Sequence, residues 1–159
     1  NSIGSIKTRK WHRLTKSWVT HLVACASEHA LTTALVASDD TLLLEPMERD
    51  RALRLLGDLL LAWQSGMRQP LPIAIKTAFA WLSQTDPVKA EAAARKAYDG
   101  DGDGQTSNGE RRESPALLRQ YPDFDALLAD ETFTGWCDAL YRPLFEAPWR
   151  SLSSEGARA

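Results

Sequence analysis

The spacing of apolar residues predicts a helix near the start of the chain. One set of side chains recurs at intervals of three or four positions and therefore lies on one helical stripe. Its members are Trp11, Leu14, Trp18, Leu22, Cys25 and His29. We expect a helix from about Leu14 to Ser27, with this stripe packed into the core.

A change to two-residue alternation after this helix predicts a β-hairpin. Residues 31–37 alternate and contain Thr and Val, which favour strands. Asp39 and Asp40 supply a turn, and Thr41 to Glu45 form the returning strand. We expect a full sheet to need further strands from upstream of Asn1.

Helices dominate the rest of the pattern. Pro46 is expected to begin a long helix that ends at Gly66 and Pro70. Its predicted buried side consists of Ala52, Leu53, Leu56, Leu59, Leu60, Trp63 and Met67. A shorter helix contains Ile75, Phe79 and Leu82.

Two pairs of residues combine a helix cap with a proline at the first helical position. Asp86-Pro87 opens a helix that runs to about Tyr98, and Ser114-Pro115 opens another after a loop from Asp99 to Ser114. The last helix carries Phe133, Trp136, Cys137, Leu140, Tyr141 and Leu144 on one face. Pro143 should kink or end it.

The pattern as a whole predicts a predominantly helical α+β fold with a small hairpin. A chain of 159 residues suits one core, so we expect a single domain over residues 1–149 and a flexible tail over residues 150–159. The chain begins at Asn1 rather than Met, and we expect it to be a fragment of a longer chain. No apolar run approaches the length of a membrane span.

The positions of the cysteines and histidines favour a role in core packing over a role as disulfide partners or metal ligands. Cys25 and Cys137 are expected to be buried free thiols in a reducing cytoplasm; a disulfide between them is the alternative. His21, Cys25 and His29 share a helix face and could ligate zinc, but three ligands from one short helix rarely close a site. We therefore expect core packing, no metal and no cofactor.

Charge is unevenly distributed although the net charge is only −2. The basic segment consists of Lys7, Arg9, Lys10, Arg13 and Lys16, and no acid precedes Glu28. Positive charge at the start of a helix is unfavourable because it opposes the helix dipole. We therefore expect the basic segment to have a role other than stabilising the helix. We predict contact with DNA or with an acidic partner; the alternative is a solvated chain end.

An acidic loop matches the EF-hand calcium pattern. Asp99, Asp101 and Asp103 occupy its first carboxylate positions, Gly104 its turn, and Glu110 its last ligand position. Thr106 stands where such loops have an apolar residue, and no second loop is present. A solvated loop is therefore favoured over calcium binding.

Catalytic templates are mostly missing. The sequence contains no phosphate-binding Gly-Lys-Ser/Thr loop and no Gly-x-Ser-x-Gly elbow. None of the lysines has an acid two positions before it. Nucleases of the PD-(D/E)xK type need that pair to place Mg²⁺ and the attacking water, so we expect no catalytic residues here.

Several stretches, in this order and spacing, carry a family resemblance over roughly residues 11–149. They are Leu14-x3-Trp18-x2-His21-Leu22, residues 55–72, Lys76 to Trp81, Arg95 to Gly100, Gly109-Glu110, residues 120–128 and residues 136–145. Together they resemble the C-terminal domain of the gamma subunit of exodeoxyribonuclease V, the RecC family.

The resemblance implies an inactive PD-(D/E)xK nuclease-like domain, with the Asp99–Glu110 loop as a variable insertion. It implies a non-catalytic part of a cytoplasmic, ATP-dependent RecBCD helicase-nuclease complex that acts in DNA repair and recombination. The implied partners are the RecB-type beta subunit, the RecD-type alpha subunit and DNA. The alternatives are a stand-alone calcium-binding protein and an active nuclease completed by upstream strands.

Overall fold

The computed structural model describes residues 11–27, 31–37, 40–101 and 108–152. They fall into two compact units, the first within residues 1–58 and 146–159 and the second from Leu59 to Phe145. The boundary lies inside one helix, α2 (Arg49–Gly66). A single domain over residues 1–149 remains a prediction.

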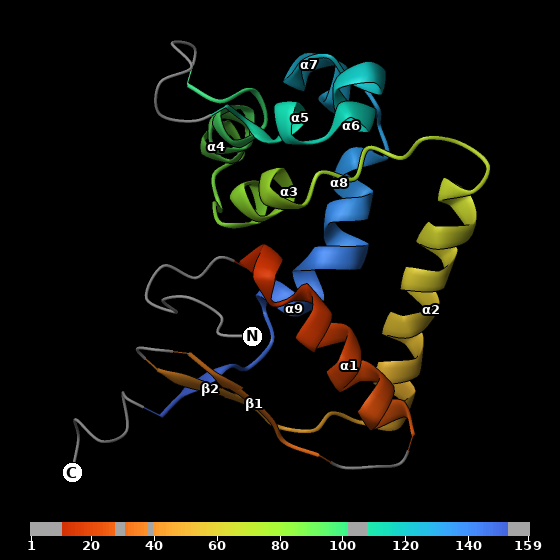
Figure 1. The fold of residues 1–159 in the computed structure, drawn as a ribbon, viewed down its shortest axis with the longest axis vertical. Coiled ribbons are helices and arrows are strands. Elements are labelled where there is room, and N and C mark those ends of the chain that lie inside the picture. Colours follow the sequence, from red (N-terminus) through yellow and green to blue (C-terminus); the bar gives the residue numbers. More distant parts are fainter. Residues whose placement is uncertain (1–10, 28–30, 38–39, 102–107, 153–159) are drawn as a thin grey trace. The chain divides into compact units, whose positions relative to one another are not determined.

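The first unit begins with the short 3-10 helix η1 (Trp11–Arg13) and the helix α1 (Thr15–Ala26) (Figure 1). Leu14, Trp18, Leu22 and Cys25 are all buried, which confirms the predicted stripe. His29, its last predicted member, lies outside the described residues. The period of the apolar side chains thus identifies both the helix and its buried face.

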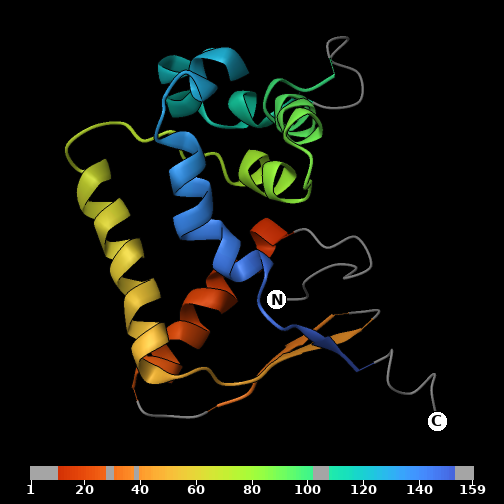
Figure 2. The same cartoon turned by 180° about the vertical axis from the view of Figure 1, so that it is seen from behind.

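The first unit also contains a three-stranded antiparallel sheet in the order β1-β2-β3 (Figure 2). The predicted hairpin is confirmed as β1 (Thr33–Val36) and β2 (Thr41–Leu44), with Thr33 opposite Leu44. The third strand, β3 (Arg150–Ser151), pairs with β2 through Leu43 opposite Arg150. It comes from the first residues of the expected tail, and a two-residue strand is too short to show alternation.

The long helix α2 departs from its prediction in two ways. It begins at Arg49 rather than at Pro46. Its predicted buried side is wrong for Leu53, Leu60, Trp63 and Met67, which are exposed, whereas Ala52 is buried. Periodicity identifies the apolar face of a helix but does not say what covers that face.

The second unit is helical in its described part. Its elements after α2 are α3 (Ile75–Leu82), α4 (Pro87–Asp99), α5 (Glu110–Glu113), α6 (Pro115–Gln120), α7 (Phe124–Leu128), α8 (Phe133–Trp136), the π-helix η2 (Cys137–Tyr141) and α9 (Arg142–Phe145). Asp86 accepts from the Lys89 amide and Ser114 from the Leu117 amide, so both predicted caps are confirmed.

The last predicted helix is continuous but changes its winding. A π-helical turn, η2, ends at Tyr141, two residues before Pro143, and the chain stays helical through the proline to Phe145. Proline has no amide proton, and its ring would collide with the carbonyl one α-helical turn earlier. Prolines commonly distort α-helices in this way, and we attribute the wider winding before Pro143 to its ring and its missing amide proton.

Aromatic side chains fill the core of the second unit. Phe124 and Phe133 are fully buried and meet edge to face, with ring centroids 6.2 Å apart. Phe79 of α3 meets Tyr141 of η2 at 5.4 Å. Such edge-to-face pairs add to the stabilisation that apolar burial supplies, and they join α3, α7, α8 and η2 around one core.

The predicted loop from Asp99 to Ser114 is wrong in its last part, where Glu110–Glu113 forms α5. The carboxylate of Glu110 is buried and accepts hydrogen bonds from the Lys76 amide at 3.0 Å and the Thr77 amide at 2.8 Å. It also accepts from the Thr77 hydroxyl at 2.8 Å. Since Ala74 at the cap position of α3 offers no side-chain acceptor, Glu110 caps α3 from outside the helix.

The coarse fold prediction is confirmed: the described residues form a mostly helical α+β arrangement with one small antiparallel sheet. No described helix combines the length and the apolar character that crossing a bilayer requires. The nuclease-like nature of the fold stays a prediction.

The capping role of Glu110 predicts a specific loss of stability. Glu110→Gln replaces one acceptor oxygen by a donor facing the amides of α3, and we expect the free energy of unfolding to fall by about 1–3 kcal/mol. Urea denaturation followed by circular dichroism measures this change. The matched control is Glu113→Gln on the same short helix: Glu113 is exposed and pairs with Lys76, so its loss should cost about 0–1 kcal/mol. Equal effects of the two substitutions would contradict the capping role.

Candidate functional site

The structure places two of the five predicted basic contact residues on one surface. Arg13 ends η1 and Lys16 lies in the first turn of α1, and both side chains are exposed. Among the described residues, neither forms an ion pair with a carboxylate. Lys7, Arg9 and Lys10 lie outside the described residues, so their role stays a prediction.

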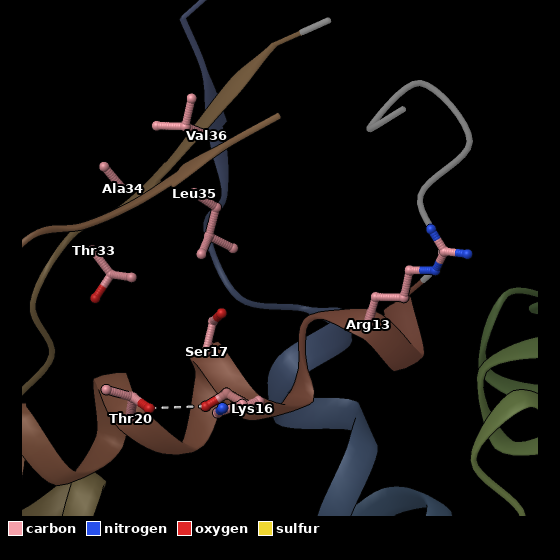
Figure 3. Close-up of a pocket in the computed structure, with 8 residues that line it drawn as sticks. All are labelled: Arg13, Lys16, Ser17, Thr20, Thr33, Ala34, Leu35 and Val36. Atoms are coloured by element: carbon pink, nitrogen blue, oxygen red, sulfur yellow. Dashed lines mark hydrogen bonds between the residues drawn. The ribbon is translucent and has the colours of Figure 1, made fainter. Parts of the chain in front are cut away.

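Arg13 and Lys16 line an open groove of about 590 Å³ between α1 and β1 (Figure 3). The α1 side also contributes the hydroxyl side chains of Ser17 and Thr20. The other side consists of all four residues of β1, Thr33 to Val36. Two cationic residues and three hydroxyl-bearing residues thus line the groove together with β1.

A buried histidine fixes the distance between the two sides of this groove. The His21 Nδ1 lies 2.8 Å from the Thr33 hydroxyl, and its Nε2 lies 3.5 Å from the Cys25 sulfur. Burial lowers the pKa of His21, which favours the neutral imidazole. A neutral ring has one donor and one acceptor nitrogen. One nitrogen contacts Thr33 and so joins α1 to β1, and the other contacts Cys25, one turn further along α1.

The second surface is the exposed apolar face of α2 within the second unit. Leu60 and Trp63 share one side of α2, and Met67, directly after its last residue Gly66, continues the same spacing of three and four. Their exposed fractions are 61%, 63% and 72%. A Trp between two other large apolar side chains on one exposed helix face is typical of a protein-binding surface.

Three of the four predicted calcium ligands have other contacts. Glu110 caps α3, as described above. Asp99 forms an ion pair with Arg111 at 3.1 Å, and Asp101 forms one with Lys96 at 2.9 Å. Asp103 lies outside the described residues, within which no cluster of three metal-ligating side chains occurs.

Both cysteines are buried free thiols, as the sequence predicts. Burial raises the pKa of Cys137 to about 12, and the nearby Asp138 adds to this effect. A thiol with such a pKa stays protonated at neutral pH and is a poor nucleophile. Cys137 therefore acts as a small, buried apolar side chain at the start of η2.

Sequence reasoning identified the cations but missed the rest of both surfaces. The edge of β1 escaped notice because a strand pattern does not tell an edge strand from a central one. The apolar face of α2 was visible in the sequence, but we assigned it to the core. An amphipathic helix looks the same whether its apolar side meets its own chain or another one.

Comparison with known families bears on both surfaces. A family model described as the RecC C-terminal domain matches residues 2–86, more than half of the chain. The match includes the basic segment, the β1–β2 hairpin and all of α2, and it confirms the resemblance. A search of curated proteins gave no match.

The contacts of the acidic loop predict how the protein responds to calcium. A ligand that binds the folded state raises the melting temperature, but Glu110 and Asp99 already bind other groups. We therefore expect millimolar Ca²⁺ to leave the melting temperature unchanged relative to equal Mg²⁺, as measured by differential scanning fluorimetry. A rise specific to Ca²⁺ that Asp103→Asn abolishes would restore the calcium-binding alternative.

Proposed function

The chain belongs to the RecC C-terminal domain family, and from this membership we propose that it acts as a non-catalytic domain of a RecBCD-type helicase-nuclease. In this role it holds subunits together and guides DNA during double-strand break repair and recombination. Its partners are then the RecB-type beta subunit, the RecD-type alpha subunit and DNA, within a cytoplasmic, ATP-dependent exodeoxyribonuclease V complex.

The apolar face of α2 is the observation that supports assembly most directly. Leu60, Trp63 and Met67 are exposed in a chain whose other large aromatic side chains pack mainly inside the two units. Exposing such a face to water is unfavourable, and covering it with another protein recovers the free energy of apolar burial. A subunit of a permanent complex meets that requirement.

The non-catalytic part of the proposal depends on what the sequence lacks. A nuclease-like fold without the acid-x-Lys pair has no carboxylate-lysine arrangement to organise Mg²⁺ and water. An active nuclease completed by upstream strands is the alternative from the enzyme class. The protein is expected to leave linear duplex and single-stranded DNA intact in the presence of Mg²⁺.

The basic segment supports the DNA-guiding part of the proposal. Its five cations are not interrupted by any acid before Glu28, while the rest of the chain is net negative. Cations so placed attract phosphates without reading base sequence. We assign this contact to Lys7, Arg9 and Lys10 in the first place, because Arg13 and Lys16 line the groove beside β1.

The assembly role predicts which substitutions weaken the complex. Trp63→Ala should lower the affinity for the partner subunits by about thirtyfold, equivalent to about 2 kcal/mol, which is the usual contribution of a central interface Trp. The chain is immobilised, and binding of the beta and alpha subunits is measured by biolayer interferometry. The melting temperature should change little, because the Trp63 side chain is exposed.

Val88→Ala is the matched control for this experiment. Val88 is an apolar residue with 78% of its surface exposed. It belongs to a different helix, α4, and is distant in sequence from the apolar face of α2. Its substitution should leave binding unchanged. If the combined Leu60→Ala, Trp63→Ala and Met67→Ala variant binds like the parent, the α2 face has no part in assembly.

The DNA-guiding role predicts a salt dependence. Binding to a single-stranded oligonucleotide should be insensitive to sequence and should weaken steeply with salt, because phosphate neutralisation releases counterions. Replacing Lys7, Arg9 and Lys10 by Ala should reduce the slope of log affinity against log salt by about three units at most. Fluorescence anisotropy measures this slope, and Arg112→Ala with Arg119→Ala is the control. A triple variant that keeps the parent slope would rule out this segment as the DNA contact.

A further inference from the structure

One side of the groove between α1 and β1 is an edge of the sheet that no other described strand covers. A phosphate-binding surface does not need such an edge. β1 is the first strand in the order β1-β2-β3, and within the described residues only β2 pairs with it. The groove is lined by β1 and by η1 and α1, without residues of β2. It therefore follows the edge of β1 that points away from β2.

The hydrogen-bonding groups on this edge follow from the sheet register. The Ala37 amide donates to the Asp40 carbonyl, so Ala37 directs its backbone toward the β2 side. Successive residues of an antiparallel strand alternate in direction, which turns Ala34 and Val36 toward the groove. The Thr41 carbonyl, opposite Val36, accepts from Leu152 on the far side of β2, in agreement with this alternation.

The side chains around this edge divide into two classes. Leu35 points toward α1, where Arg13, Lys16, Ser17 and Thr20 line the groove, whereas Ala34 and Val36 point away from α1 (Figure 3). Val36 is 68% exposed. A strand added beside β1 would place alternate side chains over the cations and the remaining side chains beside Ala34 and Val36.

We propose that the groove binds an extended acidic segment of a partner protein, which adds to the sheet as a fourth strand beside β1. Acidic residues at every second position of that segment lie over Arg13 and Lys16, and apolar residues between them lie beside Ala34 and Val36. This mode of recognition takes its affinity from main-chain hydrogen bonds and its specificity from alternate side chains.

A peptide fits this edge better than DNA does. The edge presents both N–H donors and C=O acceptors at Ala34 and Val36, and an extended peptide satisfies both kinds of group. The phosphates of a DNA backbone only accept hydrogen bonds, so they would leave the carbonyls without partners. Four paired residues span about 13 Å of strand, which is the length that Thr33 to Val36 provide.

The test uses the 159-residue chain and a fluorescein-labelled octapeptide of alternating Glu and Val. A block peptide of four Glu followed by four Val has the same composition, and an alternating Lys-Val octapeptide has the opposite charge. We expect the alternating acidic peptide to bind at least about tenfold more tightly than either, because only it matches both charge and alternation. Equal binding of the alternating and block acidic peptides would overturn strand addition.

Three substitutions separate the contribution of the strand edge from that of the charge. Ala34→Pro removes an amide that points into the groove and leaves the amides that bond β2, and it should weaken binding by about tenfold. Ala34→Thr keeps the amide and should bind like the parent. Lys16→Glu should also weaken binding by about tenfold. Peptide binding that survives Ala34→Pro in a folded variant would contradict the proposal.

Nuclear magnetic resonance keeps the proposal testable if Ala34→Pro fails to fold. On addition of the acidic peptide to the unmodified chain, the amides of Ala34 and Val36 should shift and gain protection from hydrogen exchange. The outcome that would contradict the proposal is an unchanged β1, or a dT8 oligonucleotide that binds more tightly than the peptide and shifts the same amides. Neither result bears on the α2 face, whose variants leave this groove unaltered.

Discussion

Ala74, at the cap position of α3, has no side chain that could accept a hydrogen bond, so the free amides at the start of that helix depend on Glu110, 33 residues beyond Thr77. The preceding residue makes this possible. Gly109 has a φ of +69°, and a Cβ there would lie 2.3 Å from the Tyr98 carbonyl oxygen, so only glycine allows the chain to turn back so closely after α4. The Gly109-Glu110 pair thus joins α3, α4 and α5.

The same pair decides between two functions of the acidic loop. A carboxylate that caps a helix in the core cannot at the same time supply two oxygens to a cation in a solvated loop. The sequence pattern of a calcium loop depends on spacing alone, and spacing does not reveal that Glu110 is buried against α3. The hydrogen bonds from Glu110 to α3 explain why a glutamate stands at this position, and they require no metal.

The helices, the hairpin and the helix caps were predictable from the sequence, but the surfaces that could contact partners were not. The stripe Leu14, Trp18 and Leu22, the hairpin and the caps Asp86 and Ser114 all follow from short-range rules of spacing and hydrogen bonding. The exposed face of α2 and the pairing of the third strand depend on residues distant in the chain or on what lies outside it. An apolar stripe such as Leu60, Trp63 and Met67 indicates burial, but burial by a partner protein leaves the same pattern.

Site-specific photo-crosslinking tests whether this domain docks in a RecBCD-type complex through α2. A photoreactive amino acid placed at position 63 or, for comparison, at position 88 reports what lies against each exposed side chain in the assembled complex. Docking through α2 predicts a cross-link from position 63 to the beta or alpha subunit and none from position 88. Cross-linking from position 88 with none from position 63 would contradict it.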